Sequence, residues 1–192
     1  MPLTAPDTLR VLAAVTLVPA VVNHGVIGLA LILLVLGGCM VPRALGTTAW
    51  LDAAFCSAAL FAAWAALLDW YVSVEWLDLA VHTVFTALLG LLAWQLLLRS
   101  GVLAEPTTLL AARLGAVVFT TTMATTLAAL WEIGEWLGHN HLDSSIQVGY
   151  QDTLSDLAAG VLGALAAGML AAAVAAGSPQ PVTATVEDEY AR

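Results

Sequence analysis

Long runs without charged residues dominate this sequence of 192 residues and limit the folds open to it. Several runs approach the roughly 20 apolar residues that a helix needs to cross the hydrocarbon core of a bilayer. Only 10% of the residues are charged and the mean hydropathy is +0.93. A soluble globular domain carries roughly 25% charged residues. The sequence therefore predicts an all-α integral membrane protein.

Turn signals and polar breaks divide the apolar sequence into six expected spans. The turn Asn23-His24-Gly25 separates the first two, because one helix over residues 11–41 would be about 46 Å long against a hydrocarbon core of roughly 30 Å. We therefore expect a six-helix transmembrane domain at 1–176, with its first segment retained, and a disordered cytoplasmic tail at 177–192. The expected spans are 6–22, 26–41, 49–68, 74–98, 109–137 and 152–176.

The basic residues predict the orientation of these spans. The chain has no lysine, and with six spans and a cytoplasmic N-terminus every arginine falls on the cytoplasmic side, as the positive-inside rule prefers. Both termini are then cytoplasmic. A five-span arrangement would misplace the first arginine, so six spans are favoured. The basic residues are Arg10, Arg43, Arg99, Arg113 and Arg192.

Charge and cysteine content exclude some classes of function. The formal net charge is -9, which argues against nucleic acid as a partner, because phosphate binding needs a basic surface. Cys39 and Cys56 fit neither a metal-binding spacing nor a disulfide framework, so we interpret both as packing residues. They also lie toward the expected cytoplasmic side, which leaves carboxylates and imidazoles as the candidate ligands on the other side.

Ionisable residues gather at the expected extracytoplasmic ends of three spans. On two spans they recur at i, i+3 and i+7, and on the last at i and i+4, spacings that place them on one helix face. Ionisable residues within or beside a span are functional candidates by default. These residues are Glu75, Asp78 and His82; Glu132, Glu135 and His139; and Asp152 and Asp156.

The position of each carboxylate along its helix decides how strongly it indicates a functional role. Glu75 and Asp152 lie near helix N-termini, where the macrodipole alone stabilises an anion, so a functional and a purely structural role are equally supported. Glu132 and Glu135 lie near a C-terminus, where the dipole opposes them and they repel each other. A proton or a metal ion is expected to compensate for that pair.

The positions of the histidines also separate a functional candidate from structural ones. His82 follows Asp78 by four residues inside an apolar segment, which is typical of an imidazole oriented by a carboxylate. His139, His141 and His24 lie in expected loops or turns, where a solvated histidine is the more common outcome.

Small residues predict how the last span packs. Gly160, Ala164 and Gly168 continue the four-residue spacing of Asp152 and Asp156. Such a stripe allows close backbone approach between membrane helices. We therefore expect a tight helix contact that holds the two carboxylates in place.

Three short motifs together resemble a known family. They are Trp76-Leu77-Asp78 with His82, Trp131-Glu132-Ile133-Gly134-Glu135, and Gly149-Tyr150-Gln151-Asp152-Thr153 with Asp156-Leu157 and Gly163-Ala164. In this order they resemble the YjdF-like bacterial inner-membrane proteins of unknown function and, more distantly, the VanZ-like family associated with glycopeptide resistance. Pro42-Arg43 is similar to the family's Pro-Arg step.

The chain departs from the VanZ-like pattern at Leu79, where lysine is usual, and at Gly160, where asparagine or aspartate is common. The resemblance implies a multi-pass protein of the bacterial inner membrane and supplies no reaction.

Three functions are compatible with these carboxylates and histidines. The first is a metal-dependent membrane enzyme acting on a lipid or envelope substrate, with Zn, Mn or Fe as the metal and no organic cofactor. The second is transport or sensing of a cation or proton, which the absence of an internal repeat and of midplane acids disfavours. The third is an accessory subunit. For the enzyme, Asp152 is the expected general base, and the expected metal ligands are Asp78, His82, Glu132, Glu135 and Asp156.

The arginine distribution generates a topology prediction. A reporter fused after Ser100 is expected to read cytoplasmic, and one inserted near Ser144 is expected to read extracytoplasmic. Alkaline phosphatase and fluorescent-protein fusions at both positions measure this. The reverse pattern would overturn the orientation.

Overall fold

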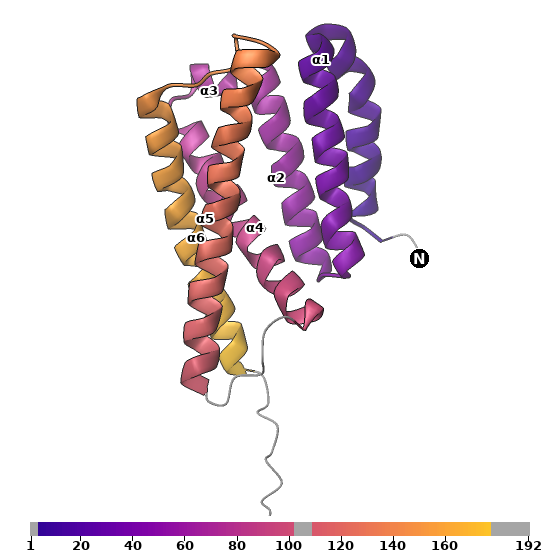
Figure 1. Cartoon of the computed structure of the whole chain (residues 1–192). Helices are drawn as coiled ribbons and strands as arrows, with labels where there is room; N and C mark the ends of the chain where they lie inside the picture. Colours follow the sequence, from indigo (N-terminus) through magenta and orange to yellow (C-terminus); the bar gives the residue numbers. More distant parts are fainter. Residues whose placement is uncertain (1–3, 102–108, 178–192) are drawn as a thin grey trace, which may run out of the picture.

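A computed structural model describes residues 4–101 and 109–177 of the chain (Figure 1). Within these residues every regular element is a helix, which confirms the all-α class. Of the six described helices, five are long and apolar enough to cross a membrane, and α3 is short. The count of six spans and the cytoplasmic termini stay predictions. The helices are α1 (Asp7–Leu45), α2 (Ala49–Leu67), α3 (Trp70–Ser73), α4 (Leu77–Ser100), α5 (Leu109–His141) and α6 (Tyr150–Gly177).

Helix α1 folds back on itself at Gly25, so its limbs, 7–24 and 26–45, lie side by side (Figure 1). Gly25 has φ 57° and ψ -132°, a backbone conformation that glycine adopts without steric cost. Just after the bend, Gly28 lies against the backbone carbonyl of Ala20, with no room for a Cβ atom between them. The reversal falls where the sequence predicts a turn.

Buried ion pairs fasten the open end of this hairpin to α2. The Arg10 guanidinium donates to Asp7 Oδ1 at 3.0 Å, to Asp52 Oδ1 at 2.5 Å and, through Nε, to the Cys39 carbonyl at 2.9 Å. Arg43 pairs with Asp7 as well. The sequence assigned Arg10 only to a side of the membrane and did not single out Asp52. Both are buried and paired, so this end of the chain is a structural joint.

Both cysteines lie beside this joint. Cys39 and Cys56 are buried and free, and the Cys56 thiol contacts Asp52 Oδ1 at 3.4 Å. This placement agrees with their interpretation as packing residues.

Helices α4, α5 and α6 form a second, closely packed group. Gly163 of α6 lies against the backbone carbonyl of Thr83 in α4, with no space for a side chain. A Cβ atom on Gly160 would lie 3.2 Å from Ala128 Cβ and 3.3 Å from the Thr86 hydroxyl. Small residues on α6 therefore permit the close approach that the sequence predicts, although the tightest contact is at Gly163, one position before the expected stripe residue Ala164.

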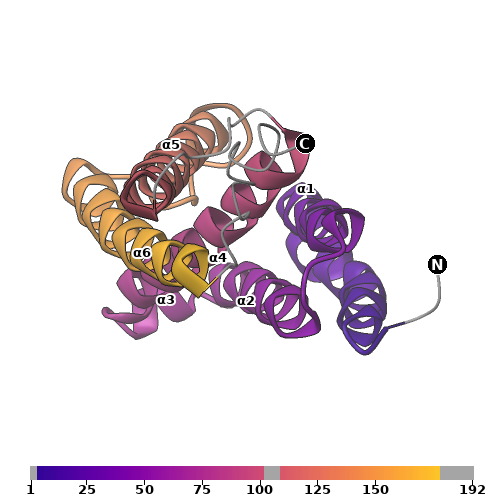
Figure 2. The ribbon, with the colours of Figure 1, turned by 90° about the horizontal axis from the view of Figure 1, so that it is seen from below.

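The two groups meet mainly through α2 and α4. Viewed along the helices, α4 lies between the α1–α2 side and the α5–α6 side (Figure 2). Phe55 of α2 stacks on Phe85 of α4, with ring centroids 5.2 Å apart. Among the described residues, α1 and α5 make no packing contact. A space lined by side chains therefore remains between them.

Several expected helix ends shift in the structure. The span expected at 74–98 begins at Leu77, because Asp69 adopts a left-handed conformation and α3 inserts a short turn of helix before it. Helix α5 continues past the expected end at residue 137 to His141. The predicted tail at 177–192, with Arg192, lies outside the described residues apart from Gly177, which closes α6.

The contact between α4 and α6 can be tested with two alanine substitutions. Gly163→Ala forces α6 away from the Thr83 backbone and is expected to destabilise the protein by about 1–3 kcal/mol, the usual effect of overpacking. Gly115→Ala, in α5 with open space around it, is the matched control and is expected to be neutral or slightly stabilising. Thermal unfolding in detergent measures both. Equal midpoints would contradict the tight contact.

The buried ion pairs generate a second stability prediction. Arg10→Met leaves the Asp52 carboxylate buried without its cation and is expected to destabilise the protein by about 3–5 kcal/mol. Adding Asp52→Asn should recover part of this loss, since the remaining group is uncharged. Arg113→Met, at an exposed position, is the control. The same unfolding measurement applies, and an Arg10→Met variant as stable as this control would refute the structural joint.

Candidate metal centre

Three helices of the second group supply the polar cluster. Asp78 and His82 lie one turn apart in the first turns of α4, Glu132 and Glu135 lie in the later part of α5, and Asp156 lies in the second turn of α6. The Gly163–Thr83 contact holds α6 against α4 directly beside His82. The backbone packing therefore sets the spacing between the His82 and Asp156 side chains.

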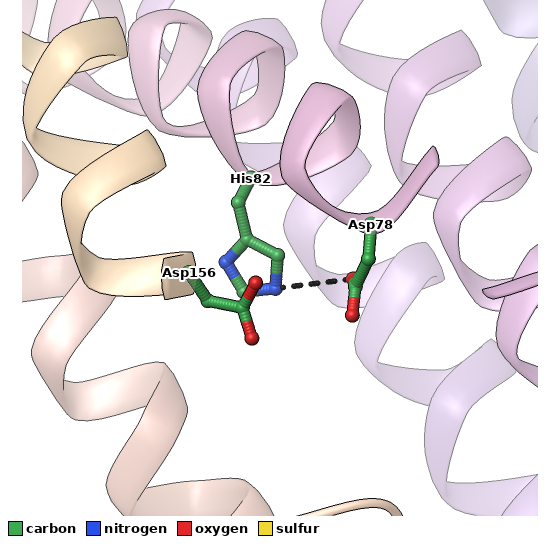
Figure 3. Close-up of side chains that lie close together, drawn as sticks. All are labelled: Asp78, His82 and Asp156. Atoms are coloured by element: carbon green, nitrogen blue, oxygen red, sulfur yellow. Dashed lines mark ion pairs between the residues drawn. The ribbon is translucent and has the colours of Figure 1, made fainter. Parts of the chain in front are cut away.

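His82 lies at the middle of the cluster. Its Nε2 is 3.5 Å from Asp78 Oδ1, and its Nδ1 is 3.7 Å from Glu132 Oε1. Possible ligand atoms of Asp78, His82 and Asp156 all lie within 4.8 Å of one another, and so do those of His82, Glu132 and Glu135. Figure 3 shows the three side chains pointing toward one another, with the ion pair between His82 and Asp78 as a dashed line and the Asp156 carboxylate close to the ring. The structure thus brings together the five residues that the sequence singled out as ligands.

Two of these carboxylates are almost fully buried. Asp156 is 3% exposed and Glu132 is 7% exposed. Glu132 Oε1 has no hydrogen-bond partner, and its nearest cationic candidate, His82 Nδ1, is beyond hydrogen-bond length. A buried oxygen without a partner is costly, typically about 1–3 kcal/mol and more when charged. Glu132 Oε1 therefore requires a proton or a cation to compensate its burial.

Tyr71 is part of this site, although no sequence pattern selects it. It lies in α3, and its hydroxyl donates to the Ala62 carbonyl at 3.1 Å. Burial, together with the charges of Asp78, Glu135 and Asp156, raises the pKa of the Tyr71 phenol above its usual range. The phenol therefore stays protonated beside the acidic groups. A lone tyrosine between two spans carries no spacing signal, which explains why only the fold reveals it.

The other candidate residues lie outside the cluster. Asp152 is half-buried on a cavity wall but belongs to neither group of ligand atoms. The prediction that Glu75 shares a helical face with Asp78 and His82 is wrong, because α4 begins two residues after Glu75, which is exposed in a turn. Asp143, which is not one of the candidates and lies between α5 and α6, accepts a hydrogen bond from the Ser145 backbone N–H, which lowers the pKa of its carboxyl group.

The remaining histidines have separate surroundings. His139 and His141 lie in the last turn of α5 and not in a loop, because the helix is longer than expected. His139 Nδ1 is 2.6 Å from the Ile146 carbonyl, and His141 is exposed. His24 lines a cavity near the bend of α1, with its ring centroid 6.4 Å from that of Trp64. Neither possible ligand group includes any of these three.

Two cavities meet at the cluster. One of about 590 Å³ has Asp78, Glu135, Asp152 and Asp156 in its wall, and one of about 410 Å³ is lined mostly by apolar side chains. Asp78, Glu135 and Tyr71 line both. The cluster therefore lies where a polar space meets an apolar one, as in many small-molecule sites.

Membrane-length helices around a buried carboxylate–imidazole cluster define a helical membrane protein with a polar centre. Residues 8–177 match the family model described as predicted membrane protein (DUF2238), so the chain belongs to this family, the YjdF-like membrane proteins. The match confirms the resemblance that the three motifs predict, whereas the more distant VanZ-like resemblance stays a prediction. No curated protein and no solved structure matches the chain.

Proposed function

We propose that this chain is a multi-pass enzyme of the bacterial inner membrane that binds a divalent metal ion at its carboxylate–histidine cluster and acts on a lipid or envelope substrate. The observation that supports the proposal is a pair of possible ligand groups that share His82, one from α4 and α6 and one from α4 and α5, each with its atoms within 4.8 Å of one another. The metal ligands in this proposal are Asp78, His82, Glu132, Glu135 and Asp156.

The donor atoms favour Zn, Mn or Fe. Carboxylate oxygens together with an imidazole suit these ions, and no thiolate is available, since Cys39 and Cys56 lie beside Arg10 and Asp52 at the other end of the helices. A cation would also satisfy Glu132 Oε1, which has no hydrogen-bond partner. One His82 nitrogen would bind the ion, while the other would face a carboxylate that orients the ring.

A metal ion in this place would polarise a substrate oxygen or activate a water molecule. Asp152, half-buried on the wall of the polar cavity, is the general base in this proposal. The Tyr71 phenol, kept protonated, is a hydrogen-bond donor at the junction of the two cavities.

The proposal includes a topology of six spans with both termini cytoplasmic. The bend at Gly25 supports two crossings by α1, with limbs of about 27 and 30 Å at 1.5 Å per residue. The cluster then lies toward the extracytoplasmic side, opposite Arg10 and Arg43.

Transport or sensing of a cation or proton is the second candidate. It is favoured by the six carboxyl groups in the wall of one cavity, those of Asp69, Asp78, Glu135, Asp143, Asp152 and Asp156. The described acids gather near the two ends of the helices, however, and do not form a path across the membrane. An accessory subunit, the third candidate, would neither bind a metal ion nor transport a cation or proton.

Metal analysis of the purified protein tests the proposal. After incubation with Zn, Mn or Fe salts and desalting, we expect about one ion per chain, lost in His82→Ala and in Glu132→Gln because each removes a ligand. His141→Ala and Glu75→Gln, at exposed positions, are the controls and should keep the ion. Removing the ion with a chelator should lower the unfolding temperature of the wild type and of both controls, but not that of His82→Ala or Glu132→Gln, since a ligand that binds the folded state stabilises it.

Three outcomes would count against the metal centre. They are a wild type that retains no ion, equal loss from His82→Ala and His141→Ala, and proton-coupled flux in liposomes without any bound metal. The last outcome would favour the second candidate.

A further inference from the structure

The smaller cavity extends from the cluster into the apolar part of the bundle. It runs beside α4 from Asp78 to Leu89, a distance of about 16 Å at 1.5 Å per residue. Its polar lining residues on α4 and α5 lie toward Asp78, and beyond Thr86 the wall is apolar. A cavity of about 410 Å³ is within the size range of ligand sites.

Small side chains on α2 leave this space open. Ala59, Ala62, Ala63 and Ala66 recur on one helix face and all line the cavity. Larger residues at these positions would fill it. The resulting space is elongated along the helices, has an apolar wall and is polar at one end.

The cavity opens sideways between α1 and α5. Leu34 of α1 and Leu130 of α5 both line it, yet they are 56% and 57% exposed. Because these two helices do not pack against each other, the opening faces outward. In a bilayer this surface meets acyl chains, so a lipid can enter from the membrane.

The charge at the polar end of the cavity determines which lipid head group would fit there. Carboxyl groups of Asp78, Glu135, Asp152 and Asp156 line the cavities, and a single divalent ion does not offset them all. Within residues 4–101 and 109–177 no arginine lines either cavity, and the chain has no lysine. Phosphate groups in proteins are usually bound by arginine or lysine. The site is therefore complementary to an uncharged or cationic group.

We infer that this cavity holds the hydrocarbon chain of a membrane lipid whose polar group, a hydroxyl or an amine and not a phosphate, lies at the cluster. The inference names the substrate class of the proposed enzyme and rests on that function for its chemistry. Binding of the hydrocarbon chain, in contrast, depends only on the cavity.

Three probes with the same chain test the inference: dodecan-1-ol, dodecylamine and dodecyl phosphate. Each is added to the purified full-length protein in detergent, and bound probe is counted by native mass spectrometry. We expect the alcohol and the amine to be retained at least tenfold better than the phosphate. Leu34→Trp and Ala66→Trp fill the cavity and should each lower retention at least tenfold. Leu33→Trp is the matched control, since Leu33 is exposed but does not line the cavity.

Metal content measured in the same samples separates the two proposals. Loss of the probes from Leu34→Trp and Ala66→Trp with metal retained supports the lipid site. Equal retention in Leu33→Trp and Leu34→Trp, or best retention of the phosphate, overturns it. A protein without metal that still binds the alcohol and amine retains the lipid site but refutes the metal centre, and a metal-loaded protein that binds no probe does the opposite.

Discussion

The contact between Gly163 and the Thr83 backbone is the constraint on which the polar centre depends. It sets the distance between α4 and α6 at a point one residue after His82 and less than two turns after Asp156. Any side chain at Gly163 would move the imidazole away from that carboxylate. The spacing between the His82 and Asp156 side chains is therefore a result of backbone packing, and the ionisable groups contribute the chemistry.

The two ends of the bundle use charge differently. Near Arg10, carboxylates and guanidinium groups are paired and buried, so their charges are balanced within the protein. At the other end His82 is the only described basic side chain in the cluster, and Glu132 Oε1 lacks a hydrogen-bond partner. Balanced buried charge supports structure, whereas an acidic excess in an apolar surrounding requires a cation or protons from outside.

Periodicity and composition were sufficient to predict the helical class, the turn before Gly25 and the face of each helix that carries Asp78, His82, Glu132 and Asp156. They did not predict the start of α4, because the left-handed Asp69 and the short α3 depend on tertiary contacts. The Arg10–Asp52 pair joins residues 42 positions apart, a separation that no local pattern records. Tyr71 was missed for the same reason, since only the folded chain places it against the cavities.

The aromatic stack of Phe55 on Phe85 is a main link between the two halves of the bundle. Helices α1 and α2 pack together on one side of this stack, and α4, α5 and α6 pack together on the other. Leu34, at the lateral opening, belongs to the first of these groups, whereas Asp78, His82, Glu132, Glu135 and Asp156 all belong to the second. A change at the α1 side of the opening can therefore alter access to the cavity while the residues of the polar cluster keep their packing contacts.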